Sequence, residues 1–229
     1  MKIVSFSLYG DNPLYTEGAL INLEYSKIIY PDWTCRFYCD ENSVPTGVLC
    51  SLKQGGGEVI IMKDTCRFFN YAPSIWRLNP FMDSSCSYFI VRDADSRLSF
   101  REKAAVDEWI ISKKTLHLLH DNEAHRSPVM AGMFGAKGNS IPDFELILAE
   151  YMKKDTHLRV GSDQRFLNRV ILPLFINDFL SHNDLLDQHG RTLSHRRFPV
   201  LERNFLAANQ SFVGQTIGVK NAKPKPHRM

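Results

Sequence analysis

The chain has 229 residues, 44% hydrophobic and 23% charged, which excludes a largely disordered protein and allows one large domain or two small ones. Its formal charge of +3 comes from 28 basic and 25 acidic residues, and four of the basic ones lie in the last ten positions. Because the rest of the chain is then close to neutral, a basic nucleic-acid-binding surface on the fold is disfavoured.

The Lys- and Pro-rich residues 216–229 are expected to form a disordered basic tail, with enough charge for weak peripheral contact with an anionic membrane. The N-terminal residues lack the apolar core and cleavage site of a signal peptide, and no apolar run approaches the roughly 18 residues of a transmembrane segment. The five cysteines have no CxxC spacing, which favours reduced thiols packed as small apolar side chains. Together these features predict a cytoplasmic protein.

Strand and helix signals alternate in the first half of the chain, a pattern typical of an α/β domain with a largely parallel sheet. Short apolar, β-prone runs bounded by turn residues predict strands at 3–8, 33–39, 58–62 and 87–92. Helical spacing of apolar residues predicts helices at 15–29 and 72–81.

The second half is less regular. Ser99, with Glu102 three residues later, predicts the N-cap of a helix that continues to residue 111. Further predicted elements are a strand at 115–120, a polar loop at 121–128, a Gly-rich apolar segment at 129–138, and helices at 142–152 and 163–175. Pro173 is expected to disturb the end of the last helix.

Asp93 and Asp95 directly follow the most apolar of the predicted strands, SYFIV. Ligands of open α/β sheets bind at the carboxyl ends of strands, and side chains two residues apart can point to the same side. Two adjacent carboxylates repel each other unless a cation lies between them, and Mg²⁺ or Mn²⁺ takes such oxygen ligands together with substrate phosphates. By itself the spacing favours a turn acid followed by a helix-capping acid, and the position directly after an apolar strand shifts the interpretation toward a ligand site.

Five segments, taken in order, resemble the nucleotide-diphospho-sugar glycosyltransferases of the GT-A fold, especially small bacterial and large-virus members. They are FSLYGDN, FYCD, APSIWRLNPF, FIVRDADS and SDQRFLN, within a resemblance that covers about residues 2–215. The resemblance implies a single Rossmann-like α/β domain over 1–215, with a mixed, mostly parallel sheet flanked by helices. Residues 1–98 would form the nucleotide-binding half and residues 99–215 the half that binds sugar and acceptor.

The same resemblance implies a metal-dependent enzyme that moves a sugar from a nucleotide-diphosphate donor, with a UDP-sugar expected, to a hydroxyl acceptor such as a glycan. Asp95 would hold Mn²⁺ or Mg²⁺, and Asp93 would contact either the same metal or the ribose. The implied donor-binding residues are Ser7, Leu8, Tyr9 and Asp11 along the nucleotide, Asp40 at the uracil or ribose, Arg77 at the diphosphate or sugar, and the Asp93, Ala94 and Asp95 block. Turn formation at Asp40 and an apolar, snorkelling role for Arg77 are the structural alternatives.

Asp163 and Gln164 resemble the family's Asp-Gln pair near the donor sugar and acceptor. If the reaction inverts configuration, Asp163 is the first candidate for the general base, with Asp121 or Glu123 second, and retention would need no such base. Capping of the helix that follows is the alternative role for Asp163.

The histidines are interpreted as part of a binding surface. His120, Asp121 and His125 are expected to line the sugar pocket, because they belong to a polar loop that precedes a Gly-rich segment. The sequence has no HExxH motif or carboxylate-histidine triad, so a zinc site is disfavoured. Some members of the family that the chain resembles take a third metal ligand from a C-terminal His, but this chain lacks their full pattern, which disfavours His182 or His189 in that role.

Two rival functions stay open. A nucleotidyltransferase shares the α/β plan and the metal dependence, although its first loop usually carries a basic residue that SLYGDNPLYTEG lacks. A catalytically inactive nucleotide-sugar-binding module is the second rival. A phosphatase of the haloacid-dehalogenase type is disfavoured, because its paired aspartates would lie on the first strand.

Overall fold

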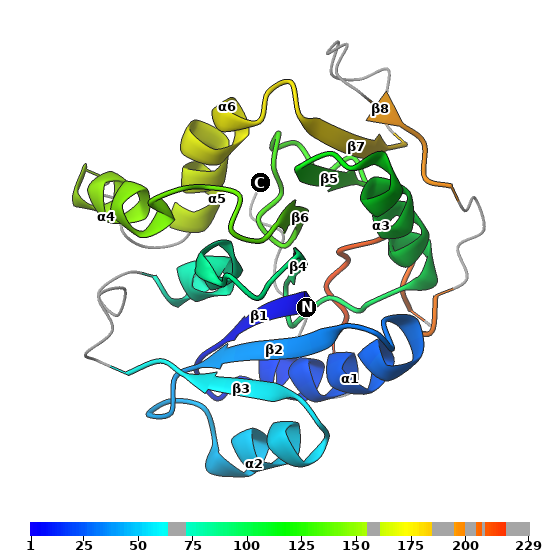
Figure 1. Cartoon of the computed structure of the whole chain (residues 1–229). Helices are drawn as coiled ribbons and strands as arrows, with labels where there is room; N and C mark the ends of the chain where they lie inside the picture. Colours follow the sequence, from blue (N-terminus) through cyan, green and yellow to red (C-terminus); the bar gives the residue numbers. More distant parts are fainter. Residues whose placement is uncertain (64–71, 155–160, 185–194, 200–204, 208, 219–229) are drawn as a thin grey trace.

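The structure is a computed structural model that describes residues 1–63, 72–154, 161–184, 195–199, 205–207 and 209–218. Within these residues, eight strands form one sheet in the order β3-β2-β1-β4-β6-β5-β7-β8 (Figure 1). The strands are β1 (Lys2–Leu8), β2 (Thr34–Cys39), β3 (Glu58–Ile61), β4 (Tyr88–Arg92), β5 (Leu116–His120), β6 (Met133–Lys137), β7 (Phe179–Asn183) and β8 (His195–Arg196). Of these described strands, β6 alone runs antiparallel to its neighbours, so the expected mixed, mostly parallel sheet is confirmed.

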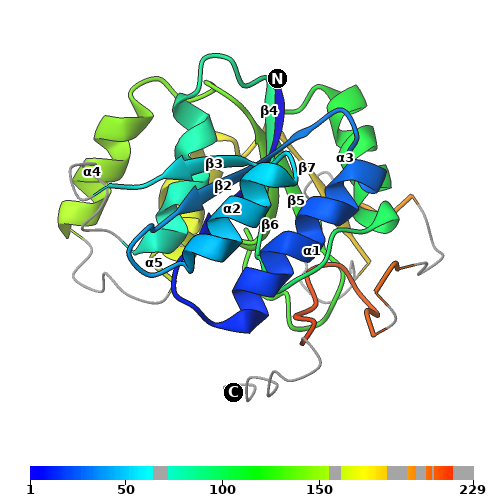
Figure 2. The same ribbon diagram turned by 90° about the horizontal axis from the view of Figure 1, so that it is seen from below.

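Helical segments cover both faces of the sheet. They are α1 (Pro13–Ile29), α2 (Thr46–Gln54), the 3₁₀ segment η1 (Pro73–Met82), α3 (Phe100–Ser112), α4 (Phe144–Lys154), α5 (Ser162–Phe166), the π-helical turn η2 (Leu167–Ile171) and α6 (Leu172–Leu174). Figure 2 shows α1 and α2 lying in front of β2 and β3. None of the helices in the described part of the chain combines the length and apolar composition that a membrane span requires.

Two large apolar clusters form most of the core, one on each face of the sheet, and a smaller third cluster contains Ala105, Leu119, Met133, Phe198 and Val213. Alternate side chains of β4 supply both clusters: Phe89 packs with η1, α4 and α5, whereas Ile90 packs with α1, α2 and α3. Burial on both faces explains why the central strands read as nearly continuous apolar runs in the sequence.

The register of the parallel strands brings their carboxyl ends to one edge of the sheet. Ser7 aligns with Tyr38 of β2, and Ser5 aligns with Val91 of β4. The loops that follow β1, β2 and β4 therefore lie side by side at this edge. Ligands of open α/β sheets bind at the carboxyl edge of the sheet.

Most predicted elements are confirmed, with shifts of one or two residues at their ends. Ser99 is the N-cap of α3, and its hydroxyl accepts a hydrogen bond from the Glu102 N–H at 3.3 Å. The helix expected over 163–175 is present as α5, η2 and α6, and its regular α-helical hydrogen bonding is interrupted just before Pro173, which lacks an N–H donor. The helix α2 was not predicted.

Candidate functional site

The turn after β4 carries the two aspartates of the D-x-D motif. The Ser96 hydroxyl and the Ser96 N–H both donate to the Asp93 carbonyl, at 2.9 and 3.2 Å, which closes the turn. The side chain of Asp93 is 49% exposed, whereas Asp95 is buried, with 8% of the residue accessible. One carboxylate of the pair is thus open to a ligand, and the other forms part of the floor beneath it.

Helix α1 holds this turn in place. The Asn22 amide donates to the carbonyls of Ala94 and Ser96, at 3.3 and 2.8 Å, and its oxygen accepts from the Leu98 N–H at 3.1 Å. Gly18 lets the helix approach, because a Cβ there would lie 2.1 Å from the Ala94 carbonyl oxygen. Neither Gly18 nor Asn22 belongs to a motif recognised in the sequence, so their contribution is visible only in the fold.

Arg77 links the D-x-D turn to the opposite wall. The Ser5 hydroxyl donates to the Arg77 carbonyl at 2.8 Å, and the Arg77 N–H donates to the Ser7 hydroxyl at 3.0 Å. These two serines share one face of β1, because they are two residues apart on a strand. The backbone of Arg77 is therefore fixed by β1.

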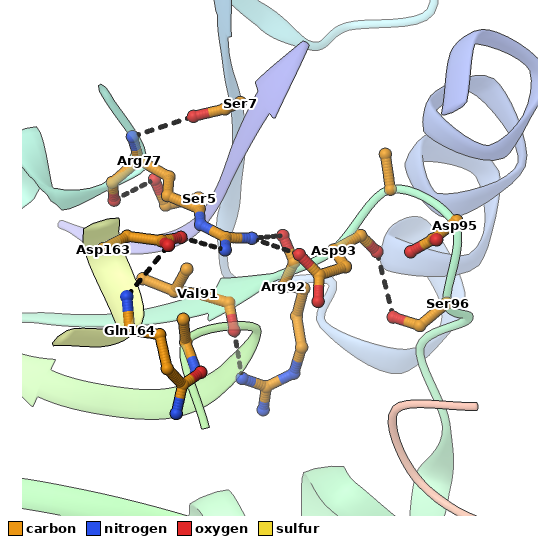
Figure 3. Close-up of polar contacts among 12 residues, drawn as sticks. Ser5, Ser7, Arg77, Val91, Arg92, Asp93, Asp95, Ser96, Asp163 and Gln164 are labelled. Atoms are coloured by element: carbon orange, nitrogen blue, oxygen red, sulfur yellow. Dashed lines mark hydrogen bonds and ion pairs between the residues drawn. The ribbon is translucent and has the colours of Figure 1, made fainter. Parts of the chain in front are cut away.

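The guanidinium of Arg77 lies between two carboxylates (Figure 3). Its Nη1 is bound to Asp93 Oδ1, and its Nη2 donates to Asp163 Oδ2 at 2.7 Å. Burial opposes the charge, but the carboxylates of Asp93 and Asp163 more than compensate and raise the pKa of Arg77 above its ordinary value. Arg77 is therefore a charged, buried part of the site, and the interpretation of its side chain as merely snorkelling along an apolar helix does not hold.

The surroundings of Asp95 disfavour its charged form. Burial, and next the negative charge of Asp93, raise the pKa of the Asp95 carboxyl to about 6. The Thr216 hydroxyl donates to Asp95 Oδ2 at 3.4 Å, and the Ile217 N–H donates to the Asp95 carbonyl at 2.7 Å. Thr216 and Ile217, which were expected to begin the disordered tail, thus lie against the D-x-D turn.

These groups surround a cleft of about 630 Å³ at the carboxyl edge of the sheet. It is lined by Ser7, Tyr9, Tyr15, Ala72, Pro73, Ser74, Arg77, Asp93, Ala94, Asp95, Gly161, Asp163 and Thr216. The charged members of this described lining are three carboxylates and one guanidinium. This imbalance, with two carboxylates on one turn, fits a divalent cation with oxygen ligands. Among the described residues, no group of three or more His, Cys, Asp or Glu side chains is arranged to hold a metal ion.

Several predicted site residues meet in the cleft and others do not. Ser7, Tyr9, Arg77, Asp93, Ala94, Asp95 and Asp163 all line it. Leu8 is 1% exposed and packs in the apolar cluster beneath α1, because it points to the other face of β1 than Ser7. Asp11 is exposed on the loop after β1 and does not line the cleft.

Asp40 forms a turn at the end of β2. Its carboxylate accepts from the Asn42 N–H at 3.0 Å and from the Ser43 hydroxyl at 2.5 Å. The Ser43 oxygen in turn accepts from the Gly10 N–H at 2.9 Å, which connects the loops after β1 and β2. In this structure Asp40 shapes the rim beside the cleft and is not among the residues that line it.

Asp121 lies outside the cleft. It is 3% exposed, accepts two hydrogen bonds from Arg101 at 2.7 and 3.0 Å, and also accepts from the Val213 N–H at 2.9 Å. A carboxylate occupied by these three donors secures the C-terminal segment and is not placed to serve as a base. Glu123 is exposed on the same loop, also outside the cleft.

Gln164 also points away from the cleft. Its amide oxygen accepts from the Ala131 N–H at 2.9 Å, and its amide nitrogen donates to the Val129 carbonyl. The neighbouring Asp163 faces the cleft instead, so the two members of the predicted pair have separate surroundings.

Four histidines among the described residues, His117, His120, His125 and His182, make contacts within the fold. His120 Nε2 is 2.9 Å from the Ser127 carbonyl, and His125 accepts from the Asp121 N–H at 3.1 Å, so neither lines the cleft. His182 lies between His117 and Glu108, at 2.8 and 3.1 Å. His189 lies outside the described residues.

The lining also contains residues that the sequence analysis did not select: Tyr15, Ala72, Pro73, Ser74, Gly161 and Thr216. Residues 72–74 lie at the start of η1, which carries Arg77, within the motif APSIWRLNPF, and Gly161 lies two residues before Asp163. Proximity to predicted residues was therefore the available signal for four of them. Tyr15 and Thr216 carried no such signal, because they reach the cleft from α1 and from the C-terminal segment.

Comparison with known proteins supports the fold. A scan of protein-family models found no match, and a search of curated proteins found none either. A solved glycosyltransferase involved in glycosylation of the major capsid of PBCV-1 matches with a TM-score of 0.51 and 12% identity, covering 80% of this chain and 81% of that one. The galactosyltransferase LgtC, in complex with donor and acceptor sugar analogues, matches with a TM-score of 0.53 and 15% identity, covering 80% and 73%.

A more distant match is a 4-diphosphocytidyl-2C-methyl-D-erythritol synthase from Anaerococcus prevotii, with a TM-score of 0.47 and 10% identity, covering 79% and 88%. Together with the strand order, the two matches above 0.5 show that the chain has the α/β fold of GT-A glycosyltransferases. At 12% and 15% identity, the similarity to these two structures establishes the fold alone, and the chemistry depends on the residues of the cleft.

Proposed function

We propose that this protein is a metal-dependent glycosyltransferase that moves a sugar from a UDP-sugar to a hydroxyl group, such as one on a glycan. The observation that carries the proposal is the arrangement of Asp93, Asp95 and Asp163 around Arg77 in one cleft at the carboxyl edge of the sheet. An anionic diphosphate needs cations in such a site, and the described lining offers one.

Asp93 and Asp95 are the residues that would hold Mn²⁺ or Mg²⁺ in this proposal. The ion would neutralise negative charge on the departing diphosphate. Asp93 is exposed to the cleft, where a cation can reach it. The pKa of Asp95 is raised by burial and by the charge of Asp93, so a nearby cation would stabilise its ionised form. Both observations support the assignment.

The nucleoside is assigned to the side of the cleft formed by Tyr9 and Tyr15. Tyr9 is 46% exposed, and its ring meets Trp76 edge-on, with centroids 6.5 Å apart. Trp76 is 1% exposed and cannot move freely, so Tyr9 is supported as a flat surface against which a base or ribose can pack.

Asp163 is assigned to the sugar-transfer step. Its Oδ1 accepts from the Gln164 N–H at 2.9 Å, and its Oδ2 accepts from Arg77, so its carboxylate is held in a single orientation. In an inverting reaction it would accept the proton of the acceptor hydroxyl, and in a retaining one it would orient Arg77 beside the leaving group. Asp163→Asn should keep UDP binding and lose transfer.

The test is thermal unfolding of the full-length protein with UDP, GDP or ADP, each with and without Mn²⁺. At a ligand concentration 100 times Kd, stabilisation of about 2.7 kcal/mol is expected, or roughly 5–10 °C for a chain of this length. UDP with Mn²⁺ should produce this shift in the wild type and in Asp143→Asn, a matched aspartate outside the cleft. The shift should be absent in Asp95→Asn.

The result also separates the rival functions. Indifference to every nucleotide would rule out the proposal. Stabilisation by nucleoside triphosphates, with release of pyrophosphate from the triphosphate when it reacts with a sugar phosphate, would indicate a nucleotidyltransferase. Binding of UDP without transfer or hydrolysis of any UDP-sugar would indicate an inactive binding module. The expected cytoplasmic location and membrane contact of the tail stay predictions.

A further inference from the structure

Arg77 is the only cation among the described residues that line the cleft, and both of its terminal nitrogens are bound to carboxylates. One of these carboxylates belongs to Asp93, which we have assigned as a metal ligand. The same oxygen of Asp93 cannot keep its short contact with Arg77 and also coordinate a divalent cation in an undisturbed geometry. The two cations therefore compete for Asp93.

A second observation concerns the remaining donor of Arg77. Within the described part of the chain, its Nε–H is buried and has no hydrogen-bond acceptor. A buried guanidinium donor without a partner is unfavourable, and such groups in native proteins usually mark a place for a ligand. The planar edge formed by Nε and a terminal nitrogen matches two oxygens of a phosphate group.

The anchoring of Arg77 limits which part of it can move. Ser5 and Ser7 hold its backbone carbonyl and N–H. The guanidinium is held by Asp93, by Asp163 and by a 3.4 Å hydrogen bond from Nη1 to the Arg92 carbonyl, and a second cation can replace it at Asp93. A shift of the guanidinium from Asp93 toward an incoming anion therefore requires rotation of the side chain and no change in η1.

We propose, on the basis of the proposed function, that Arg77 is the counterion of Asp93 in the empty site. When a divalent cation binds to Asp93, it displaces the Arg77 guanidinium, and the guanidinium then pairs with the donor diphosphate. The two ligands therefore bind in sequence: the affinity for the nucleotide diphosphate rises only after the cation has released Arg77 from Asp93. Arg77 thus opposes metal binding to the empty site and favours binding of the nucleotide.

One substitution should then change two affinities in opposite directions. In Arg77→Met, the Mn²⁺ affinity measured without nucleotide should rise about tenfold, because the competitor for Asp93 is gone. The affinity for UDP at saturating Mn²⁺ should fall at least about tenfold, because the phosphate loses its partner. A residue with only a structural role would lower both affinities when replaced.

The experiment is calorimetric titration of the full-length protein, first with MnCl₂ alone and then with UDP in saturating Mn²⁺. Arg77→Lys is the second variant, since it keeps a buried cation opposite Asp163 and protects against misfolding. Lysine cannot span both carboxylates as the guanidinium does, so Mn²⁺ affinity should still rise several-fold. Arg165→Met is the control, because that guanidinium approaches Gly161 on the cleft wall, with Nη1 3.6 Å from where a Cβ would lie.

The outcomes separate the two proposals. Tighter Mn²⁺ binding in both Arg77 variants, with weaker UDP binding and no such change in Arg165→Met, supports the counterion role. If the wild type binds Mn²⁺ and UDP but the Arg77 variants bind Mn²⁺ equally or less well, the counterion role is wrong and the proposed function stands. An equal gain in Arg165→Met would show a general charge effect and also overturn it. If the wild type binds neither ligand, both proposals fail.

Discussion

Gly18 lies where α1 meets the D-x-D turn, and its replacement by alanine tests whether this contact positions the turn. The added Cβ would lie 2.1 Å from the Ala94 carbonyl oxygen, whereas such atoms essentially never approach closer than 3.0 Å. The helix or the turn must therefore move by about 1 Å in a closely packed interior. The turn is not free to yield, because the same oxygen accepts hydrogen bonds from Asn22 and Arg97, at 3.3 and 3.0 Å.

The expected cost follows from these contacts. Overpacking of this kind costs about 1–3 kcal/mol, and distortion of the two hydrogen bonds adds about 1 kcal/mol. Alanine recovers up to about 1 kcal/mol through its higher helix propensity. Gly18→Ala should therefore be about 2 kcal/mol less stable than the wild type, a fall in Tm of roughly 4–8 °C for a chain of this length.

The measurement is thermal and urea unfolding, together with Mn²⁺ titration, because a displaced turn should also weaken metal binding. Gly47→Ala is the matched control: this glycine lies in α2, and no atom is within 4 Å of the place that an added Cβ would take. Its Tm should be unchanged or slightly raised. If Gly18→Ala is as stable as Gly47→Ala, the close approach of α1 does not hold the turn.

Two further predictions concern the supports of the fold. Asn168 accepts from the Val129 N–H at 2.9 Å and donates to Ser127, Val129 and Gln164, so Asn168→Ala should cost about 2 kcal/mol. Hydrogen exchange should then be faster at residues 127–131, and unchanged exchange there would contradict this role. Burial raises the pKa of Asp83, but hydrogen bonds from Ser85 and Arg36 more than offset it and hold the pKa at about 2. Solvent screening reduces the resulting stabilisation relative to Asp83→Asn to about 1 kcal/mol, which should be complete above about pH 5 and be lost as the pH falls through about 2. Urea unfolding measures it, and a difference independent of pH would refute it.

The strands of the first half could be predicted because their signals are local. An apolar run such as SYFIV, followed by turn residues, has few alternatives to a buried strand. Ser99 and Glu102 identified the start of α3 for the same reason, since capping involves residues three apart. Helix α2 lacked such signals: it buries only Leu49 and Leu52 and has no side-chain cap.

The position of the D-x-D motif was likewise determined by sequence, because it directly follows a strand and so lies at a carboxyl end. Which other side chains reach it was decided by the order of strands in the sheet. That order brings Arg77 to Asp163 across 86 residues, and residues 216–217 to Asp95 across more than 120.

The sequence by itself supplied a set of chemically similar acids after strands and at helix starts, and the tertiary structure divided them by function. Asp121 is bound by Arg101 and the Val213 N–H, so its charge is used within the fold. Asp93, Asp95 and Asp163 line one cleft with a single guanidinium, and this leaves negative charge for a ligand to balance. Burial and ion pairing depend on partners that are distant in the chain, and for that reason only folding decides which carboxylates are structural and which face the cleft.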